Sequence, residues 1–134
     1  MVNDASKNFW PYYKYSKFLE TDNFLWHYQL IGKPNKPTIL LIHGAGASAH
    51  SWSNLIPKLP EFQILMVDLP GHRFSKIKRG IRPQHDIIVR DLVVLFGSLK
   101  IKPNIFVGHS IGAVIVLSLS DIYEGPLSSI VLIN

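Results

Sequence analysis

Four short, mostly apolar runs constrain the fold of this chain more than any other feature. They cover residues 38–42, 62–67, 104–107 and 129–133. A strand that lacks alternation of apolar and polar side chains is typical of a sheet buried on both faces. The runs are separated by helix candidates at residues 50–59, 83–100 and 111–120. The last of these is apolar around almost its whole circumference, so we expect it to be buried. Strands that alternate with helices predict an α/β fold with a mostly parallel sheet.

An antiparallel hairpin is predicted before the first of these runs. Residues 17–20 and 24–31 flank the turn-forming sequence Thr21-Asp22-Asn23, and the second segment alternates aromatic and polar side chains. We expect this hairpin at the edge of the sheet with one aromatic face. We assign residues 1–16 to an N-terminal extension and residues 17–134 to one domain.

Composition narrows the classes of protein and site. A chain of 134 residues with 47% hydrophobic and 17% charged residues is long and apolar enough for one globular core. The absence of cysteine excludes a disulfide scaffold, a thiolate metal site and a cysteine nucleophile. No apolar segment approaches the ~20 residues of a membrane span, and residues 1–15 lack a signal-peptide pattern. We therefore expect a cytoplasmic protein.

The net charge of +5 raises the question of anionic partners. One cationic cluster stands out, formed by Arg73, Lys76, Lys78, Arg79 and Arg82. Because no aromatic residues are interleaved as on a single-strand binding surface, a solvated loop is favoured over nucleic-acid binding. Attraction of an acidic substrate is a third possibility that depends on where the loop lies.

The motif Gly-x-Ser-x-Gly occupies residues 108–112, directly after a predicted strand and directly before a predicted helix. This context requires a sharp turn that strains the serine backbone, and Gly108 and Gly112 remove side chains that would collide there. Ser110 is therefore the candidate nucleophile of a nucleophile elbow, at a helix N-terminus that favours negative charge. The alternative is a serine N-cap on an ordinary strand-to-helix loop, which the two glycines disfavour.

A second small-residue loop, His43-Gly44-Ala45-Gly46, follows the first buried strand. An acyl-transfer enzyme needs two backbone N–H groups directed at the oxyanion, one after the nucleophile and one from a neighbouring loop. Ile111 and Ala45 are the candidate donors of this oxyanion hole. A plain turn or a phosphate-binding loop is the alternative. Ala49 replaces the last glycine of Gly-x-Gly-x-x-Gly, which weakens dinucleotide binding without excluding it.

Together with Asp-Leu-Pro-Gly-His at residues 68–72, the order and separation of these motifs resemble the N-terminal half of an α/β-hydrolase-fold protein. The resemblance implies a serine hydrolase that cleaves an ester, thioester, amide or activated C–C bond of a small acyl-type substrate. It implies no metal ion or cofactor, and a structural rather than catalytic Asp68. Fold-mates with an aspartate nucleophile, such as epoxide hydrolases, are disfavoured because position 110 is serine. Family members usually carry glycine where this chain has Arg73. Arginine at a site of positive φ is strained by about 1 kcal/mol or more, and the alternative is a loop of different shape in this chain.

A narrower resemblance rests on residues 8–11 (Asn-Phe-Trp-Pro), residues 26–27 (Trp-His) and residues 44–52. These segments are similar to the magnesium-chelatase accessory proteins of bacteriochlorophyll synthesis, a subfamily with the same fold. The resemblance implies a second hypothesis, a non-catalytic accessory or binding protein of tetrapyrrole biosynthesis, because a fold does not decide function.

The acid and the base that would activate Ser110 are not found in the sequence. In this fold they follow the nucleophile in the order acid, then histidine, but the 24 residues after Ser110 contain only Asp121, Glu124 and no histidine. Some family members carry the acid where this chain has Asn134, and an amide cannot do that work. We therefore expect an N-terminal fragment, truncated after about the sixth strand, inactive and with an exposed apolar edge at residues 130–133.

The histidines near the predicted site are not expected to replace that base. His109 is next to Ser110 in the chain, and its side chain cannot reach the hydroxyl in the usual elbow geometry. For His43, His50 and His72, on loops at the same end of the sheet, we expect local hydrogen bonds.

Overall fold

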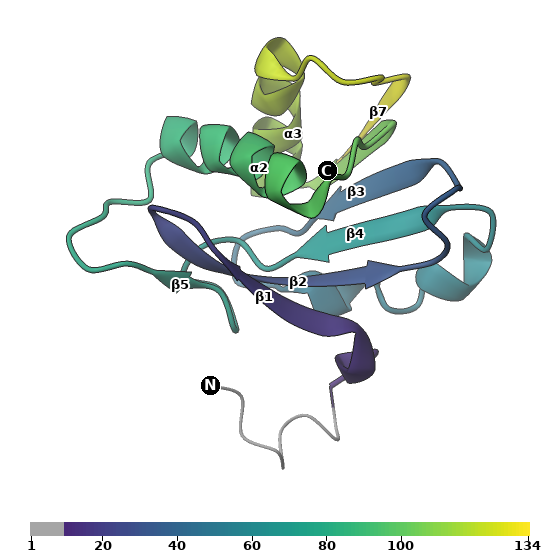
Figure 1. Ribbon diagram of the computed structural model, residues 1–134, viewed down its shortest axis with the longest axis horizontal. Helices are drawn as coiled ribbons and strands as arrows, with labels where there is room; N and C mark the ends of the chain where they lie inside the picture. The colour runs from purple at the N-terminus through teal and green to yellow at the C-terminus, as the bar shows by residue number, and fades with distance from the viewer. Residues whose placement is uncertain (1–9) are drawn as a thin grey trace.

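The computed structural model describes residues 10–134. Residues 1–9 lie outside the described part, and with them most of the predicted N-terminal extension and the Asn8-Phe9 pair of the narrower resemblance. The described residues form one seven-stranded sheet with the order β1-β2-β4-β3-β6-β7, and β5 pairs with β2 (Figure 1). The strands are β1 (Ser16–Glu20), β2 (Phe24–Ile31), β3 (Thr38–Ile42), β4 (Gln63–Val67), β5 (Lys76–Ile77), β6 (Ile105–His109) and β7 (Ser129–Ile133).

The direction of the strands follows the sequence-based prediction. β1 and β2 form the expected antiparallel hairpin at one edge of the sheet, and the Thr21 N–H donates to the Phe24 carbonyl across its turn, at 2.9 Å. β2 is antiparallel to β4, whereas β3 is parallel to both β4 and β6, and β6 is parallel to β7. The six predicted strands are all present, and β5 is an additional short one.

Both faces of the central sheet are buried, which explains the continuous apolar runs. Leu40 and Ile42 of β3 pack on the side of the two long helices, α2 (His85–Leu99) and α3 (Ile111–Ile122). Ile39 and Leu41 of the same strand face the opposite cluster, which contains Trp52. Figure 1 shows α2 and α3 together on one side of the sheet. Each successive side chain of β3 therefore enters a core.

The predicted helix at residues 50–59 is wrong. Two short 3-10 helices replace it, η2 (Ala49–Trp52) and η3 (Ile56–Lys58); a third, η1 (Tyr13–Tyr15), precedes β1. Pro57 explains the interruption, because proline has no N–H to donate and its ring obstructs the preceding turn of an α-helix. The helix predicted at residues 83–100 is confirmed as α2, which begins two residues later.

The prediction that α3 is buried all round is also wrong. Ile115, Val116 and Leu119 lie in the core, but Val114 and Leu117 are 51% and 52% exposed. No element formed by residues 10–134 covers that side of α3, because β7 is the last strand in the sheet order. β7 itself exposes Val131, Leu132 and Ile133, so the expected apolar edge is confirmed.

Within residues 10–134, no helix combines the length and hydropathy required to cross a membrane. The same part of the chain has no cluster of three or more His, Asp or Glu side chains placed to hold a metal ion.

Candidate active site

Ser110 lies at the junction of β6 and α3, which confirms the predicted strand–turn–helix context. Its backbone has φ 56° and ψ −118°, a region that residues with a β-carbon rarely occupy. Such a conformation costs of the order of 1–3 kcal/mol and persists only where surrounding contacts hold it. One such contact is its own N–H, which donates to the Ile133 carbonyl of β7 at 3.0 Å.

The two glycines of the motif are required by close approach of backbone segments. A Cβ on Gly108 would overlap the Gly112 carbonyl oxygen, and a Cβ on Gly112 would overlap the Ile42 carbonyl and lie 2.6 Å from that of His43. Helix α3 therefore packs directly on the ends of β6 and β3. The steric reason given for both glycines from the sequence is confirmed.

The Ser110 hydroxyl is not used as a helix cap. Ser110 occupies the N-cap position of α3, its carbonyl accepts from the Ala113 N–H at 2.9 Å, and its side chain makes no capping hydrogen bond. Its side chain is exposed. A helix leaves its first N–H groups without intrahelical partners, here those of Ile111 and Gly112. An uncommitted hydroxyl beside free N–H groups disfavours the ordinary N-cap interpretation.

The loop after β3 lies beside this junction. β3 and β6 are adjacent parallel strands in which Ile42 is paired with Gly108, so residues 43–46 leave the sheet next to residues 109–112. A Cβ on Gly44 would lie 2.8 Å from His109 Nδ1, which places the two loops in contact. Gly46 has φ 74°, and the Ala47 N–H donates to the Gly44 carbonyl at 3.1 Å. The structure thus brings the loops of Ala45 and Ile111 to the same end of the sheet.

A small pocket of about 250 Å³ opens at this point. It is lined by His43, Gly44, Ala47, Ser51, Trp52 and His109. Two of the lining segments are the loops that carry the candidate oxyanion donors. The pocket therefore lies beside the elbow, next to His109, although Ser110 itself does not line it.

No histidine of residues 10–134 is hydrogen-bonded to the Ser110 hydroxyl. His43 is buried, with Nδ1 2.7 Å from the Gly44 carbonyl and Nε2 accepting from the Leu69 N–H at 2.9 Å. Burial lowers the pKa of His43, and the weaker opposing effect is its hydrogen bond to Gly44. These contacts define a neutral imidazole whose two nitrogens are both occupied.

The other loop histidines have partners elsewhere. His50 contacts the Ser48 hydroxyl, and His72 Nδ1 lies 3.3 Å from the Pro70 carbonyl. The expected local hydrogen bonds of His43, His50 and His72 are confirmed. His85 forms an exposed contact with Ser118 Oγ at 2.7 Å, on the outer side of α2 and α3.

The two acidic residues after the elbow are far from it. Asp121 and Glu124 are exposed at the opposite end of α3, and Asp121 is eleven residues beyond Ser110. At 1.5 Å per residue this separation is about 16 Å along the helix axis. Asn134 follows β7, whose Ile133 is paired with His109, so an amide occupies the position beside the elbow.

Asp68 has the structural role expected from the sequence. It is fully buried and accepts hydrogen bonds from the Ala49 N–H at 2.7 Å and the Phe74 N–H at 3.2 Å. Its second oxygen also lies 2.7 Å from Nδ1 of the buried His27. These bonds join β2, the first residue of η2 and the loop after β4. The pairing with His27 was missed from the sequence, because 41 residues separate the two.

The cationic loop between β4 and α2 is tied to the fold at two points. Of the two alternatives for Arg73, the structure shows a positive φ, 43°, and the guanidinium lies 4.4 Å from the ring centre of Trp10. Lys78 forms an ion pair with Glu20 at 2.7 Å, next to the pairing of β5 with β2. Because Arg73 is stacked and Lys78 is paired, these two charges serve the folded chain itself.

Residues 37–134 match the family model described as the alpha/beta hydrolase fold. The chain belongs to the α/β-hydrolase family. Its curated relatives include the magnesium-chelatase 30 kDa subunit of Rhodobacter capsulatus, 32% identical over 93% of this chain and 44% of the relative. Epoxide hydrolase A of Mycobacterium tuberculosis is 34% identical over 63% of this chain and 27% of its own length.

Solved structures in this α/β-hydrolase family have the same arrangement of strands and helices. A hydrolase from Pseudomonas aeruginosa PA01 superposes with a TM-score of 0.78 and 26% identity, over 87% of this chain and 44% of that structure. The chain therefore spans less than half the length of the relatives it matches.

Proposed function

We propose that this chain carries the nucleophile and both oxyanion donors of a serine hydrolase acting on a small acyl-type substrate. The observation that supports this most strongly is the Ser110 backbone, with φ 56° and ψ −118°, at the N-terminus of α3. A strained residue that leaves its hydroxyl exposed and uncapped is difficult to explain by packing alone. Nucleophilic attack requires this presentation, because the oxygen must reach a carbonyl carbon from an open side.

The proposed chemistry uses Ser110 and two backbone N–H groups. The Ser110 oxygen forms a bond to the substrate carbonyl carbon while its proton passes to a base, and the N–H groups of Ile111 and Ala45 stabilise the oxyanion. The leaving group departs with that proton, and water then cleaves the acyl-enzyme. The small pocket of about 250 Å³ beside the elbow is the proposed location of part of the substrate.

The base and its orienting carboxylate are proposed to lie in sequence outside these 134 residues. The histidines of the described part contact other groups, and Asp121 and Glu124 are at the far end of α3. A serine without its histidine loses most of its reactivity, of the order of 10⁴- to 10⁶-fold in well-studied triads. We therefore propose that the 134-residue chain is an inactive N-terminal part of the enzyme.

The test is labelling with a fluorophosphonate, which reacts with activated serines. It is applied to the protein as its own cells produce it, followed by peptide mapping. We expect the label on Ser110 and its loss in Ser110→Ala. Ser118→Ala is the matched control, because Ser118 lies on α3 and its hydroxyl contacts His85, and this variant should label normally. Absence of label, or a label retained in Ser110→Ala, would contradict the proposal.

A second candidate function is supported by the match to the magnesium-chelatase 30 kDa subunit, which extends over 93% of this chain. On this hypothesis the same scaffold serves as a non-catalytic accessory protein of tetrapyrrole biosynthesis. The protein would then stimulate magnesium insertion into protoporphyrin by a chelatase, and Ser110→Ala would stimulate equally. Fluorophosphonate labelling without any stimulation favours the hydrolase, and stimulation without labelling favours the accessory protein.

A further inference from the structure

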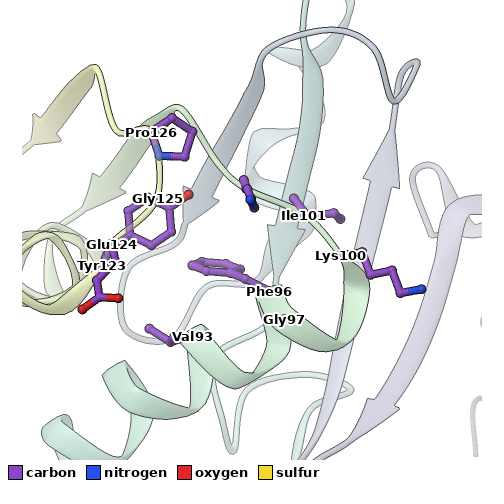
Figure 2. Close-up of a pocket in the computed structure, with 10 residues that line it drawn as sticks. Val93, Phe96, Gly97, Lys100, Ile101, Tyr123, Glu124, Gly125 and Pro126 are labelled. Carbon is purple, nitrogen blue, oxygen red and sulfur yellow. The ribbon is translucent and has the colours of Figure 1, made fainter.

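A second pocket, of about 860 Å³, lies at the end of the sheet opposite Ser110. It is formed by the last turns of α2, the loop that leads into β6 and the loop that follows α3. Figure 2 shows Phe96, Tyr123 and Val93 around its interior. Its volume is in the range of small-molecule sites, and the hydrolase chemistry proposed above does not use it.

The inner wall of this pocket is aromatic. The rings of Phe96 and Tyr123 are 5.9 Å apart at an interplanar angle of 80°. The Tyr123 hydroxyl donates to the Pro103 carbonyl at 2.6 Å, and burial raises the pKa of Tyr123. Because that hydroxyl is already bonded, Tyr123 offers the pocket the apolar surface of its ring.

Gly97 leaves part of the pocket wall without a side chain. It lies in the last turn of α2. Apart from its chain neighbours and the backbone of its own helix, no atom of residues 10–134 lies within 4 Å of the position of an added Cβ. Packing therefore does not require glycine, and its φ is not in the positive range. Glycine destabilises a helix interior relative to alanine. Glycine at position 97 therefore adds no stability to the fold, but it keeps this part of the pocket wall open.

Lys100, in contrast, stands at a position where a helix favours glycine. It follows α2 with φ 56° and ψ 42°, where its N–H donates to the Gly97 carbonyl and the Ile101 N–H donates to the Phe96 carbonyl. Glycine is preferred at such a helix end, because other residues are strained there. Helix α2 thus carries glycine where a helix prefers alanine, and lysine where it prefers glycine. Both exceptions lie at the same pocket, and departures from local preference concentrate at functional sites.

The charged groups at the rim indicate the sign of a ligand. Lys100 and Lys102 line the pocket, and Glu124 is the one acidic lining residue. Figure 2 shows the Lys100 side chain extending outward from the rim, on a flexible stem that can turn toward a ligand. We propose that this pocket binds a small apolar carboxylate, with its apolar body over Gly97 between Phe96 and Tyr123 and its carboxylate on Lys100 and Lys102.

The first test is a titration of the ¹⁵N-labelled protein, in the form that its own cells produce, with 1-naphthylacetate, followed by amide chemical shifts. We expect shifts confined to the pocket, at Gly97, Ile101 and Gly125, and affinity at least fivefold weaker for the neutral isostere 1-naphthylacetamide. Absence of binding at millimolar concentration would overturn the proposal. Equal affinity of the two compounds, or shifts on the exposed side of α3, would overturn it as well.

The second test uses variants for which binding and stability should change in opposite directions. Gly97→Leu fills the open wall, so naphthylacetate affinity should fall at least tenfold while Tm stays level or rises, because an interior glycine has been replaced. Lys100→Gly should weaken binding about fivefold and raise Tm by a few degrees, because backbone strain is relieved. Unchanged affinity in either variant would refute the site.

Two variants with the same loss of charge test the site without reference to Tm. Lys102→Gln and Arg82→Gln each remove one exposed cation, but only Lys102 lines the pocket. We expect weaker naphthylacetate binding for Lys102→Gln and wild-type binding for Arg82→Gln. Equal losses in both variants would indicate a general charge effect and contradict the proposal.

Discussion

Removal of the Asp91 carboxylate should destabilise the protein strongly, because this group joins α2 to the β1–β2 hairpin. Asp91 is buried and accepts hydrogen bonds from Trp26 Nε1 at 2.6 Å, Thr21 Oγ1 at 2.7 Å and Asn23 Nδ2 at 3.1 Å. These donors belong to the β1–β2 hairpin, so one carboxylate joins the edge of the sheet to the helix that covers it. Asp91→Ala removes the acceptor for all three.

The loss in free energy of unfolding depends on whether each donor finds another partner in Asp91→Ala. Trp26 is fully buried, so its indole N–H is left unsatisfied, at a cost of about 2–3 kcal/mol. Thr21 can turn to the Phe24 carbonyl, now 3.3 Å away, and the partly buried Asn23 amide can turn to solvent, so these two add about 1 kcal/mol. The total of about 3–4 kcal/mol is a large part of the 5–15 kcal/mol typical of a domain.

The assay is urea unfolding followed by far-ultraviolet circular dichroism. With a slope of about 1.5–2 kcal/mol per molar, a loss of this size lowers the midpoint by about 2 M. Asp91→Asn keeps one acceptor for Trp26 and should lose only about 1 kcal/mol. Asp86→Ala removes an exposed carboxylate from the first turn of the same helix and should lose at most about 1 kcal/mol. The reasoning is refuted if Asp91→Ala and Asp86→Ala have the same midpoint.

Three further outcomes follow from the geometry. Arg73→Ala should lose about 0.5–1 kcal/mol, because it forfeits the stacking on Trp10 and keeps the positive φ, whereas Arg73→Gly should be close to neutral in the same urea assay. Gly112→Ala should destabilise by at least 2–3 kcal/mol, because its Cβ overlaps the Ile42 carbonyl, and the control Gly46→Ala, with open space but φ 74°, by about 1 kcal/mol; equal losses would contradict the steric argument. Because burial lowers the pKa of His43, the unfolded chain binds a proton at this imidazole more readily than the folded chain does. The contribution of neutral His43 to the free energy of unfolding should be fully present above pH ~6.5 and should fall as the pH drops below that value. His43→Gln should flatten that part of the curve, and an unchanged slope would assign the pH dependence to other groups.

Local sequence patterns were sufficient where the cause is local. The apolar runs predict strands buried on both faces because period and burial are carried by neighbouring residues, as in β3 with Leu40 and Leu41 on opposite sides. The strained Ser110 follows from the glycines on either side of it. The one failed helix, at residues 50–59, contained its own explanation in Pro57.

Long-range packing decided the features that no local pattern contains. The exposed side of α3 depends on which elements lie over it, and the sequence of the helix itself is apolar around almost its whole circumference. Asp68 meets His27 across 41 residues, and Asp91 meets Trp26 across 65, so their hydrogen bonds could not be predicted from spacing. The pocket at Gly97 combines three segments that are separate in the chain.

The sequence by itself therefore determined the α/β fold class, the order of the strands along the chain and the turn that holds Ser110. These three depend on periodicity and on the space that glycine leaves, both of which are properties of short segments. The fold family came from the resemblance of the motifs to known proteins. Only the tertiary structure decided which buried polar groups are paired, which apolar faces stay uncovered and where pockets form. Each of these depends on residues brought together from distant parts of the chain, and hydrogen bonding and burial are satisfied only where those parts meet.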